Sequence, residues 1–219
     1  MNRRWNSKDF KIGVLGGGQL GRMLIQEAID LDVHLHMIDP DPNAPCALIA
    51  HSFTCGSITD YDTVIEFGKD KDLITVEIEN VNIEALEALE QNGVKIFPQP
   101  RVLRIIKDKG IQKQFYVDHN IPTAPFTLYD NANALEEANI SYPIIQKMRT
   151  GGYDGKGVQL LQQSSHSYDA PNLCESLIDF DKELSVIVAR NENGDVQCFP
   201  SVECEFNSEA NLVEYLFSP

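Results

Sequence analysis

The sequence has little of what would place it in a membrane, a secretory pathway or a metal-binding class. No apolar run approaches the ~20 residues of a membrane span, and the polar N-terminus lacks the apolar segment of a signal peptide. The chain has no Cys-x-x-Cys pair, and its cysteines and histidines show no metal-ligand spacing. We therefore expect a cytoplasmic protein without a membrane or a metal site among these residues, and with reduced, buried or half-buried thiols.

Positive charge is also scarce. Lys and Arg number 18 against 33 Asp and Glu, which gives a formal net charge of −15. This balance argues against non-specific binding to nucleic acid or anionic membranes. Solubility alone is an alternative reason for the negative net charge. A polyanionic ligand would have to be bound by local lysines and arginines. The 219 residues, 42% of them apolar, suffice for one large domain or two small ones.

Residues 10–97 alternate between short apolar runs and helical patterns. The expected strands are 10–15, 33–39, 51–55, 73–78 and 94–97, and the expected helices are 20–31, 60–68 and 82–90. One face of the first helix carries Leu20, Met23, Leu24, Ala28 and Leu31. This order predicts an α/β, Rossmann-like fold with a parallel sheet covered on both faces, and ligands at the C-terminal ends of its strands.

The pattern changes between residues 98 and 110. Helices are expected at 108–119 and 131–139, with an extended linker at 121–125 and a loop at 162–172. Strands are expected at 143–145, 158–161, 173–180, 183–190 and 196–199. A further strand at 210–217 is expected to lack its partners.

The first glycine motif is Gly16-x-Gly18-x-x-Gly21, after the first strand. With Asp39 it fits the dinucleotide fingerprint of an NAD-dependent oxidoreductase, but it equally suits the single phosphate of a sugar phosphate at a helix N-terminus. Asp39 would hold a ribose hydroxyl or cap the turn at Pro40. Glu77 and Glu79 face either the crevice or solvent.

The second glycine motif has four glycines within residues 151–157, between two apolar runs. Such a strand–loop–strand segment turns backbone N–H groups inward and attracts triphosphates. Lys147 and Lys156 bracket it with charges suited to phosphate oxygens. A glycine hairpin without a ligand is the alternative interpretation.

Together these residues resemble the ATP-grasp enzymes and, among them, the 5-(carboxyamino)imidazole ribonucleotide synthetases of purine biosynthesis. The matching segments are 13–24, 38–40, 76–81, 107–109, 112–113, 121–125, 150–157 and 183–187. The resemblance implies an N-terminal α/β substrate-phosphate-binding domain at 1–108, an ATP-grasp lid subdomain at 109–178, and the start of the larger ATP-grasp subdomain at 179–219.

The resemblance also implies an ATP-dependent ligase. Bicarbonate would attack the γ-phosphate of ATP to give carboxyphosphate, whose carboxyl group, or the CO2 released from it, passes to the amine of aminoimidazole ribonucleotide. Its partners would be these small molecules and a second copy in a homodimer, not nucleic acid.

Individual roles follow from the same resemblance. Lys109 and Lys147 would bind phosphates, Glu183 the ribose, and Asp154 would orient or deprotonate the amine beside Tyr153. The expected catalytic residues are Lys147, Tyr153 and Asp154. The expected nucleotide-binding residues are Lys109, Lys147, Gly152, Tyr153, Asp154, Gly155, Lys156, Gly157, Val158, Glu175, Ser176, Leu177, Ile178 and Glu183. The expected substrate-binding residues are Gly18, Gln19, Leu20 and Glu79. Glu175 and Glu183 could instead be surface charges.

The sequence also departs from the family. The acidic magnesium ligands and the C-terminal substrate motif are expected beyond residue 219, so we expect these 219 residues alone to show weak or no catalysis. The family's Asn-x-His pair has no counterpart, because Phe206 stands near the histidine position. Another ATP-grasp ligase and a non-catalytic nucleotide-binding module remain alternatives.

Overall fold

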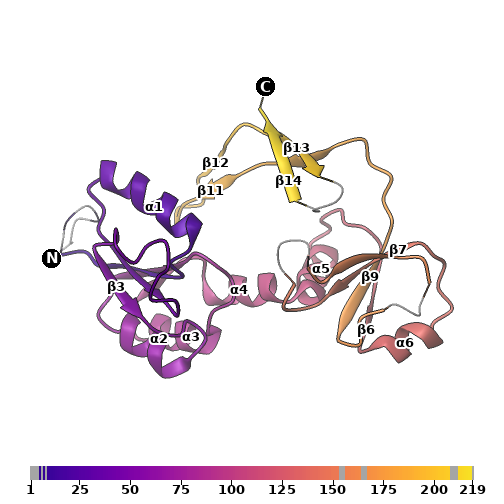
Figure 1. Ribbon diagram of the computed structural model, residues 1–219, viewed down its shortest axis with the longest axis horizontal. Coiled ribbons are helices and arrows are strands. Elements are labelled where there is room, and N and C mark those ends of the chain that lie inside the picture. The colour runs from indigo at the N-terminus through magenta and orange to yellow at the C-terminus, as the bar shows by residue number, and fades with distance from the viewer. Residues whose placement is uncertain are drawn as a thin grey trace. The chain divides into compact units, whose positions relative to one another are not determined.

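A computed structural model of the chain describes residues 5, 7, 9–152, 156–163, 167–207 and 212–218. It divides into two compact units, Met1–Asp108 and Lys109–Pro219 (Figure 1). The division falls within the range 98–110 expected from the sequence. The finer boundary at residue 178 stays a prediction.

The first unit is built on a five-stranded parallel sheet in the order β3-β2-β1-β4-β5. Its strands are β1 Ile12–Leu15, β2 Leu35–Asp39, β3 Ser52–Cys55, β4 Leu73–Val76 and β5 Lys95–Ile96. Its helices are α1 Gln19–Asp30, α2 Tyr61–Gly68, α3 Ile83–Gln91 and α4 Pro100–Lys107. The α/β fold with a parallel sheet is therefore confirmed.

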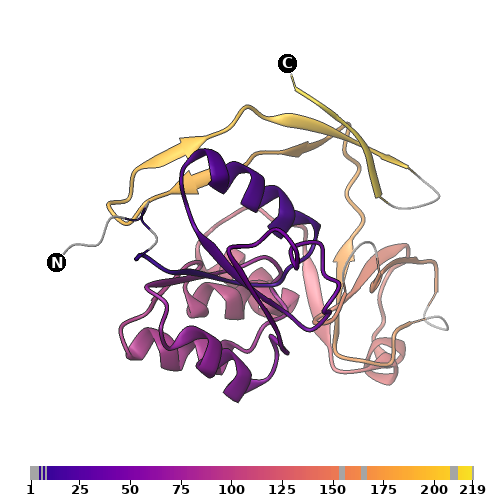
Figure 2. The ribbon, with the colours of Figure 1, turned by 60° about the vertical axis from the view of Figure 1, so that its left-hand side comes forward.

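Helices cover both faces of this sheet, α1 on one side and α2 with α3 on the other (Figure 2). Side chains alternate along each strand between the two sides. Val14 and Met37 belong to the core under α1, whereas Leu15, Ile38 and Ile74 belong to the core under α2 and α3. Strands β1 and β2 are thus apolar on both faces, as is typical of the inner strands of a parallel sheet.

The predicted inner face of α1 was wrong except at Ala28. The buried residues are Gly21, Ile25 and Ala28. A Cβ on Gly21 would lie only 2.9 Å from Met37 Cε and 3.1 Å from Cys46 Sγ, so the glycine sets which face approaches the sheet. The larger side chains predicted to lie inward are exposed, namely Leu20, Met23, Leu24 and Leu31.

The helix boundaries follow the capping chemistry of the sequence. Asn82 Oδ1 accepts a hydrogen bond from Ala85 N at 2.8 Å at the start of α3, and Gly93, at φ +91°, follows its end. Asp60 caps α2 in the same way through Thr63 N. Helix α4 was not predicted, although Pro100 at its first turn is a favourable start.

The second unit contains a four-stranded antiparallel sheet in the order β6-β9-β7-β8. Its strands are β6 Phe126–Tyr129, β7 Ile144–Met148, β8 Val158–Leu161 and β9 Asn172–Ser176. Helices α5 Lys109–Asp118 and α6 Ala132–Glu137 accompany it. A three-stranded sheet of β10 Glu183–Ser185, β13 Val202–Asn207 and β14 Leu212–Phe217 follows, as does a hairpin of β11 Val188–Arg190 and β12 Val196–Cys198.

Several strand predictions in this unit needed correction. The expected strand 183–190 divides into β10 and β11, which belong to different sheets, and β9 ends at Ser176 rather than at residue 180. Strands β6 and β13 were missed. The prediction that 210–217 lacks partners was wrong, because β14 pairs with β13 in antiparallel register.

The cysteines are all free, but only Cys46 and Cys174 are buried and Cys204 is half-buried. Cys55 and Cys198 are exposed, so the expectation of buried or half-buried thiols was wrong for these two. Among the described residues, no helix has the length and apolar character that crossing a bilayer requires.

Candidate functional sites

The first glycine motif connects the C-terminal end of β1 to α1. Gly16 has φ +106°, a conformation that disfavours any residue with a Cβ. Gly18 is the N-cap of α1 without a side-chain cap, and Gln19 and Leu20 are exposed at its first turn. The first N–H groups of a helix have no intrahelical partner, so this end can receive an anion.

The carboxylate of Glu77, just after β4, lies against this loop. A Cβ on Gly16 would be 2.7 Å from Glu77 Oε2, and one on Gly18 would be 2.7 Å from Glu77 Oε1. A phosphate at Gly16, next to this carboxylate, would be repelled, which leaves the exposed start of α1 for an anion. The strand expected to carry Glu77 and Glu79 ends at Val76, and Glu79 is exposed.

Asp39, at the C-terminal end of β2, holds the loop from the other side. Its Oδ2 accepts a hydrogen bond from Gly17 N at 2.8 Å, and its Oδ1 accepts one from Asp41 N at 2.9 Å. Both oxygens thus have backbone partners, which favours the turn interpretation over a ribose-binding one. Nearby, burial and then Glu77 raise the pKa of the Cys46 thiol, so Cys46 stays protonated rather than nucleophilic.

The second unit holds a cluster of three charges, formed by the buried Glu175 of β9, the buried Lys113 of α5 and the partly exposed Lys147 of β7. Glu175 Oε1 lies 2.5 Å from Lys113 Nζ of α5, and Glu175 Oε2 lies 2.6 Å from Lys147 Nζ of β7. Glu175 is 5% exposed and Lys113 is 8% exposed. The alternative that Glu175 is a surface charge is therefore wrong.

The two lysines decide the ionisation of this glutamate. Burial alone would raise the pKa of Glu175, but the hydrogen bonds from Lys113 and Lys147 outweigh burial and lower it. Glu175 is consequently an anion near neutral pH. Lys147 is the more open of the two lysines, with 31% of its side chain exposed against 11% for Lys113.

The second glycine motif lies between β7 and β8, which pair through Lys147 and Val158. Its two ends touch, because a Cβ on Gly152 would lie 2.7 Å from Lys156 O. The same Cβ would lie 3.7 Å from Lys109 Nζ. The fold thus brings Lys109, 43 positions earlier in the sequence, beside this glycine segment.

The remaining predicted site residues are undescribed or have no contact with the cluster of Lys113, Lys147 and Glu175 among the contacts given above. Tyr153, Asp154 and Gly155 lie outside the described residues. Lys156 is exposed, Gly157 has φ +73°, and Ser176, Leu177 and Ile178 are exposed at the end of β9. Glu183 is half-exposed at the start of β10, in a separate sheet, and is not a partner of Glu175.

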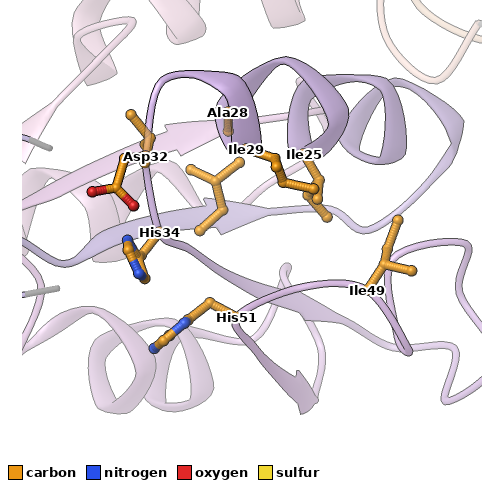
Figure 3. Close-up of a pocket in the computed structure, with 9 residues that line it drawn as sticks. Ile25, Ala28, Ile29, Asp32, His34, Ile49 and His51 are labelled. Atoms are coloured by element: carbon orange, nitrogen blue, oxygen red, sulfur yellow. The ribbon is translucent and has the colours of Figure 1, made fainter. Parts of the chain in front are cut away.

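A pocket of about 240 Å³ in the first unit lies away from the first glycine motif. It is lined by α1, by the start of β2 and by the segment before β3, with His34, His51 and Asp32 on one side (Figure 3). Ligands of parallel sheets bind at the opposite, C-terminal strand ends, so we assign this pocket no role.

Among the described residues, no group of three His, Cys, Asp or Glu could hold a metal ion. They offer no magnesium site, and ligands beyond residue 219 stay a prediction.

Lys113 is the residue of this cluster to which the sequence alone assigned no role. Its position was a usable signal, because Lys109 and Lys113 are four residues apart in α5 and share one face of the helix. What the sequence does not show is that Glu175, 62 positions later, supplies the counter-ion.

Two family models match the chain. Residues 10–107 match the ribonucleotide synthetase preATP-grasp domain, and residues 114–216 match the ATP-grasp domain. Among curated proteins, the N5-carboxyaminoimidazole ribonucleotide synthase of Synechococcus elongatus is 36% identical over 201 residues, which are 88% of this chain and 51% of that protein. The chain thus spans about half the length of this relative.

Solved structures agree. The carboxyaminoimidazole ribonucleotide synthase of Aspergillus clavatus complexed with ATP gives a TM-score of 0.84 at 32% identity, over 93% of this chain and 56% of that one. The structure of the synthase from the same organism in complex with ADP and 5-aminoimidazole ribonucleotide gives 0.81 at 30% identity, over 94% and 55%.

Proposed function

The chain belongs to the ATP-grasp proteins, with a ribonucleotide synthetase preATP-grasp domain before its ATP-grasp domain, and on this premise we propose that it serves the ATP-dependent carboxylation of 5-aminoimidazole ribonucleotide. The products are the carboxyamino ribonucleotide, ADP and phosphate. The observation that carries the proposal is the strand lysine, Lys147, beside a glycine turn and paired with the buried Glu175. Relatives with this fold have been solved with ATP and with ADP plus 5-aminoimidazole ribonucleotide.

The chemistry of this site is positioning and electrostatics. In phosphoryl transfer the protein stabilises charge on phosphate oxygens and aligns the groups, without supplying a nucleophile. Lys147 and Lys109 flank the glycine turn and would bind the phosphates. A bicarbonate oxygen attacks the γ-phosphorus, the bond from that phosphorus to the ADP oxygen breaks, and carboxyphosphate forms.

The second step transfers the carboxyl group to the amine. The amine nitrogen attacks the carboxyl carbon of carboxyphosphate, or the CO2 that it releases, and phosphate leaves. The nitrogen loses a proton, for which Asp154 is the proposed acceptor, next to Tyr153. A carboxylate within hydrogen-bond reach is suited to this task.

In the first unit, Gly18, Gln19 and Leu20 at the start of α1 would hold the 5′-phosphate of the ribonucleotide, as an uncapped helix N-terminus can. Glu77 and Glu79 would accept hydrogen bonds from groups of the substrate that carry N–H or O–H. The carboxylate of Glu77 lies against the loop, which supports the binding of N–H or O–H groups of the substrate at this place rather than of a second phosphate. A cytoplasmic homodimer is proposed by analogy with the family.

The alternatives are distinguishable. An NAD-dependent oxidoreductase would need Asp39 for a ribose, whereas the observed role of this carboxylate is to accept the backbone N–H groups of Gly17 and Asp41. A melting temperature that rises with NADH and not with ATP would favour that alternative. Another ATP-grasp ligase would use the same nucleotide site with a different acceptor.

The test is ADP release by the natural-length protein with magnesium, ATP and bicarbonate, with and without aminoimidazole ribonucleotide. The proposal requires a rate that rises sharply with the ribonucleotide and collapses in Lys147→Ala and Asp154→Asn. Nucleotide binding without any response to the ribonucleotide would redirect the search to other acceptor amines.

A further inference from the structure

The charge cluster of the second unit is asymmetric. Glu175 is contacted by one ammonium on each carboxylate oxygen, Lys113 on Oε1 and Lys147 on Oε2. The side chain of Lys113 is almost enclosed, whereas that of Lys147 is about a third exposed. The two lysines therefore differ in their freedom to meet a ligand.

Lys113 has no capacity left for a ligand. An ammonium group has three N–H donors, and Lys113 Nζ has three acceptors: Glu175, Thr123 Oγ1 and Ala124 O, the last at 3.4 Å. The ring of Phe126 on β6 lies 5.6 Å from the same nitrogen. If Lys113 turned away, it would leave a buried carboxylate and a half-buried hydroxyl without their partner, which is costly.

Lys147 is in the opposite situation. In the described part of the chain Glu175 is its one ion-pair partner. An ammonium at this position can keep one donor on Glu175 or direct its donors to phosphate oxygens. The movement of the Lys147 ammonium away from Glu175 costs little free energy only if another cation stays beside this carboxylate.

We infer that Lys113 is a positioning residue that keeps Glu175 a fixed anion, so that Lys147 can pass from this carboxylate to the phosphates of a nucleotide. The inference rests on the proposed function, since it concerns the binding of ATP or ADP. Without the charge of Lys113, Lys147 would be the sole counter-ion of a buried carboxylate. Lys147 would then either stay on Glu175 or move to the phosphates, and in the second case the carboxylate of Glu175 would take up a proton.

The surroundings of Glu175 support this division of roles. Among the described residues, the charged groups that face its carboxylate are Lys113 from α5 and Lys147 from β7, while β6 places Phe126 opposite it in the sheet. Burial would raise the pKa of Glu175, and the two lysines together reverse that effect. Removing one of them leaves burial less opposed, which favours the protonated acid.

The experiment is calorimetric titration of the natural-length protein with ADP near neutral pH, in buffers of different ionisation enthalpy. The wild type is expected to bind ADP without net uptake of a proton by Glu175. Lys113→Gln, which removes the charge, should bind about tenfold more weakly or with proton uptake. Lys113→Arg should restore wild-type behaviour. The matched control, Thr123→Val, removes an acceptor but no charge and should show no proton uptake.

A Lys113→Gln variant that binds ADP with wild-type affinity and without proton uptake would overturn the inference. If Lys113→Gln does not fold, the wild type is decisive through the carboxyl 13C resonance of Glu175. This resonance must remain that of a carboxylate in the ADP complex at pH values near 6, and a protonated Glu175 would contradict the inference.

A ligand-free measurement separates this inference from the proposed function. If the wild type binds no ADP, the proposed function fails, and titration of the Glu175 carboxyl resonance still tests Lys113. A higher pKa in Lys113→Gln than in Thr123→Val would support the hold of Lys113 on Glu175. Equal values in both variants would refute it.

Discussion

The carboxylate of Glu77 packed against the first glycine loop leads to a quantitative prediction for Gly16→Ala. The new side chain would be strained at φ +106°, and its Cβ would lie 2.7 Å from Glu77 Oε2 and 2.9 Å from Glu77 Cβ. Strain at a positive φ costs roughly 1–2 kcal/mol, and displacing a packed neighbour costs roughly 1–3 kcal/mol more. We expect Gly16→Ala to destabilise the first unit by about 2–5 kcal/mol.

Gly93 provides the matched control. It has φ +91°, close to that of Gly16, but no atom lies within 4 Å of an added Cβ. Gly93→Ala should therefore cost only the backbone strain, about 1–2 kcal/mol. Gly18→Ala is a second control, because Gly18 has φ −74° and its Cβ would meet only the carboxyl end of Glu77, which can shift, and not Glu77 Cβ. We expect its cost to remain below about 1 kcal/mol.

The assay is urea denaturation followed by circular dichroism, with hydrogen exchange of β1 and β2 to assign the change to the first unit. The double variant Gly16→Ala/Glu77→Ala should recover the contribution of the carboxylate but not that of the retained Glu77 Cβ. Equal destabilisation by Gly16→Ala and Gly93→Ala would refute the contact between Glu77 and the loop.

Three further predictions follow from the described contacts. Lys147→Ala should weaken ATP binding by about tenfold or more, because a cation on the phosphates is lost; unchanged affinity by calorimetry would exclude Lys147 from the nucleotide site. Asn82→Ala should destabilise the first unit by about 1 kcal/mol through loss of the cap on Ala85 N, whereas Asn92→Ala, past the end of the same helix, should cost less in the same urea titration. Burial, and then Lys71, lowers the pKa of His36 from 6.5 to about 4. Since the unfolded chain binds a proton between these values that the folded chain does not, stability is full above about pH 6.5 and falls toward pH 4. His36→Gln should flatten this decline by roughly 1–2 kcal/mol after allowance for solvent screening, and an unchanged pH profile would show that His36 is not buried uncharged.

The parallel sheet was predictable because its strands are short apolar runs separated by helical patterns, two of which begin at the capping residues Asp60 and Asn82. The face of α1 was not, because Gly21 decides it through close contacts with Met37 and Cys46 that lie elsewhere in the sequence. The same holds for β14, whose partner β13 could be identified only through the pairing itself.

The candidate sites divide in the same way. Lys147 and the second glycine motif were predictable, because strand, lysine and glycines are contiguous in the sequence. The pairing of Lys113 with Glu175 was not, since it joins a helix to a strand across 62 positions. The position of Glu77 depended likewise on β4 lying next to β1 in the sheet.

The most direct test of the central claim follows the carboxyl group itself. The natural-length protein is incubated with magnesium, ATP, 13C-bicarbonate and aminoimidazole ribonucleotide, and the product is observed by 13C NMR. The account predicts a labelled carbamate carbon that appears only with ATP and is strongly reduced in Lys147→Ala. ADP formation without any labelled carbon on the ribonucleotide amine would contradict it.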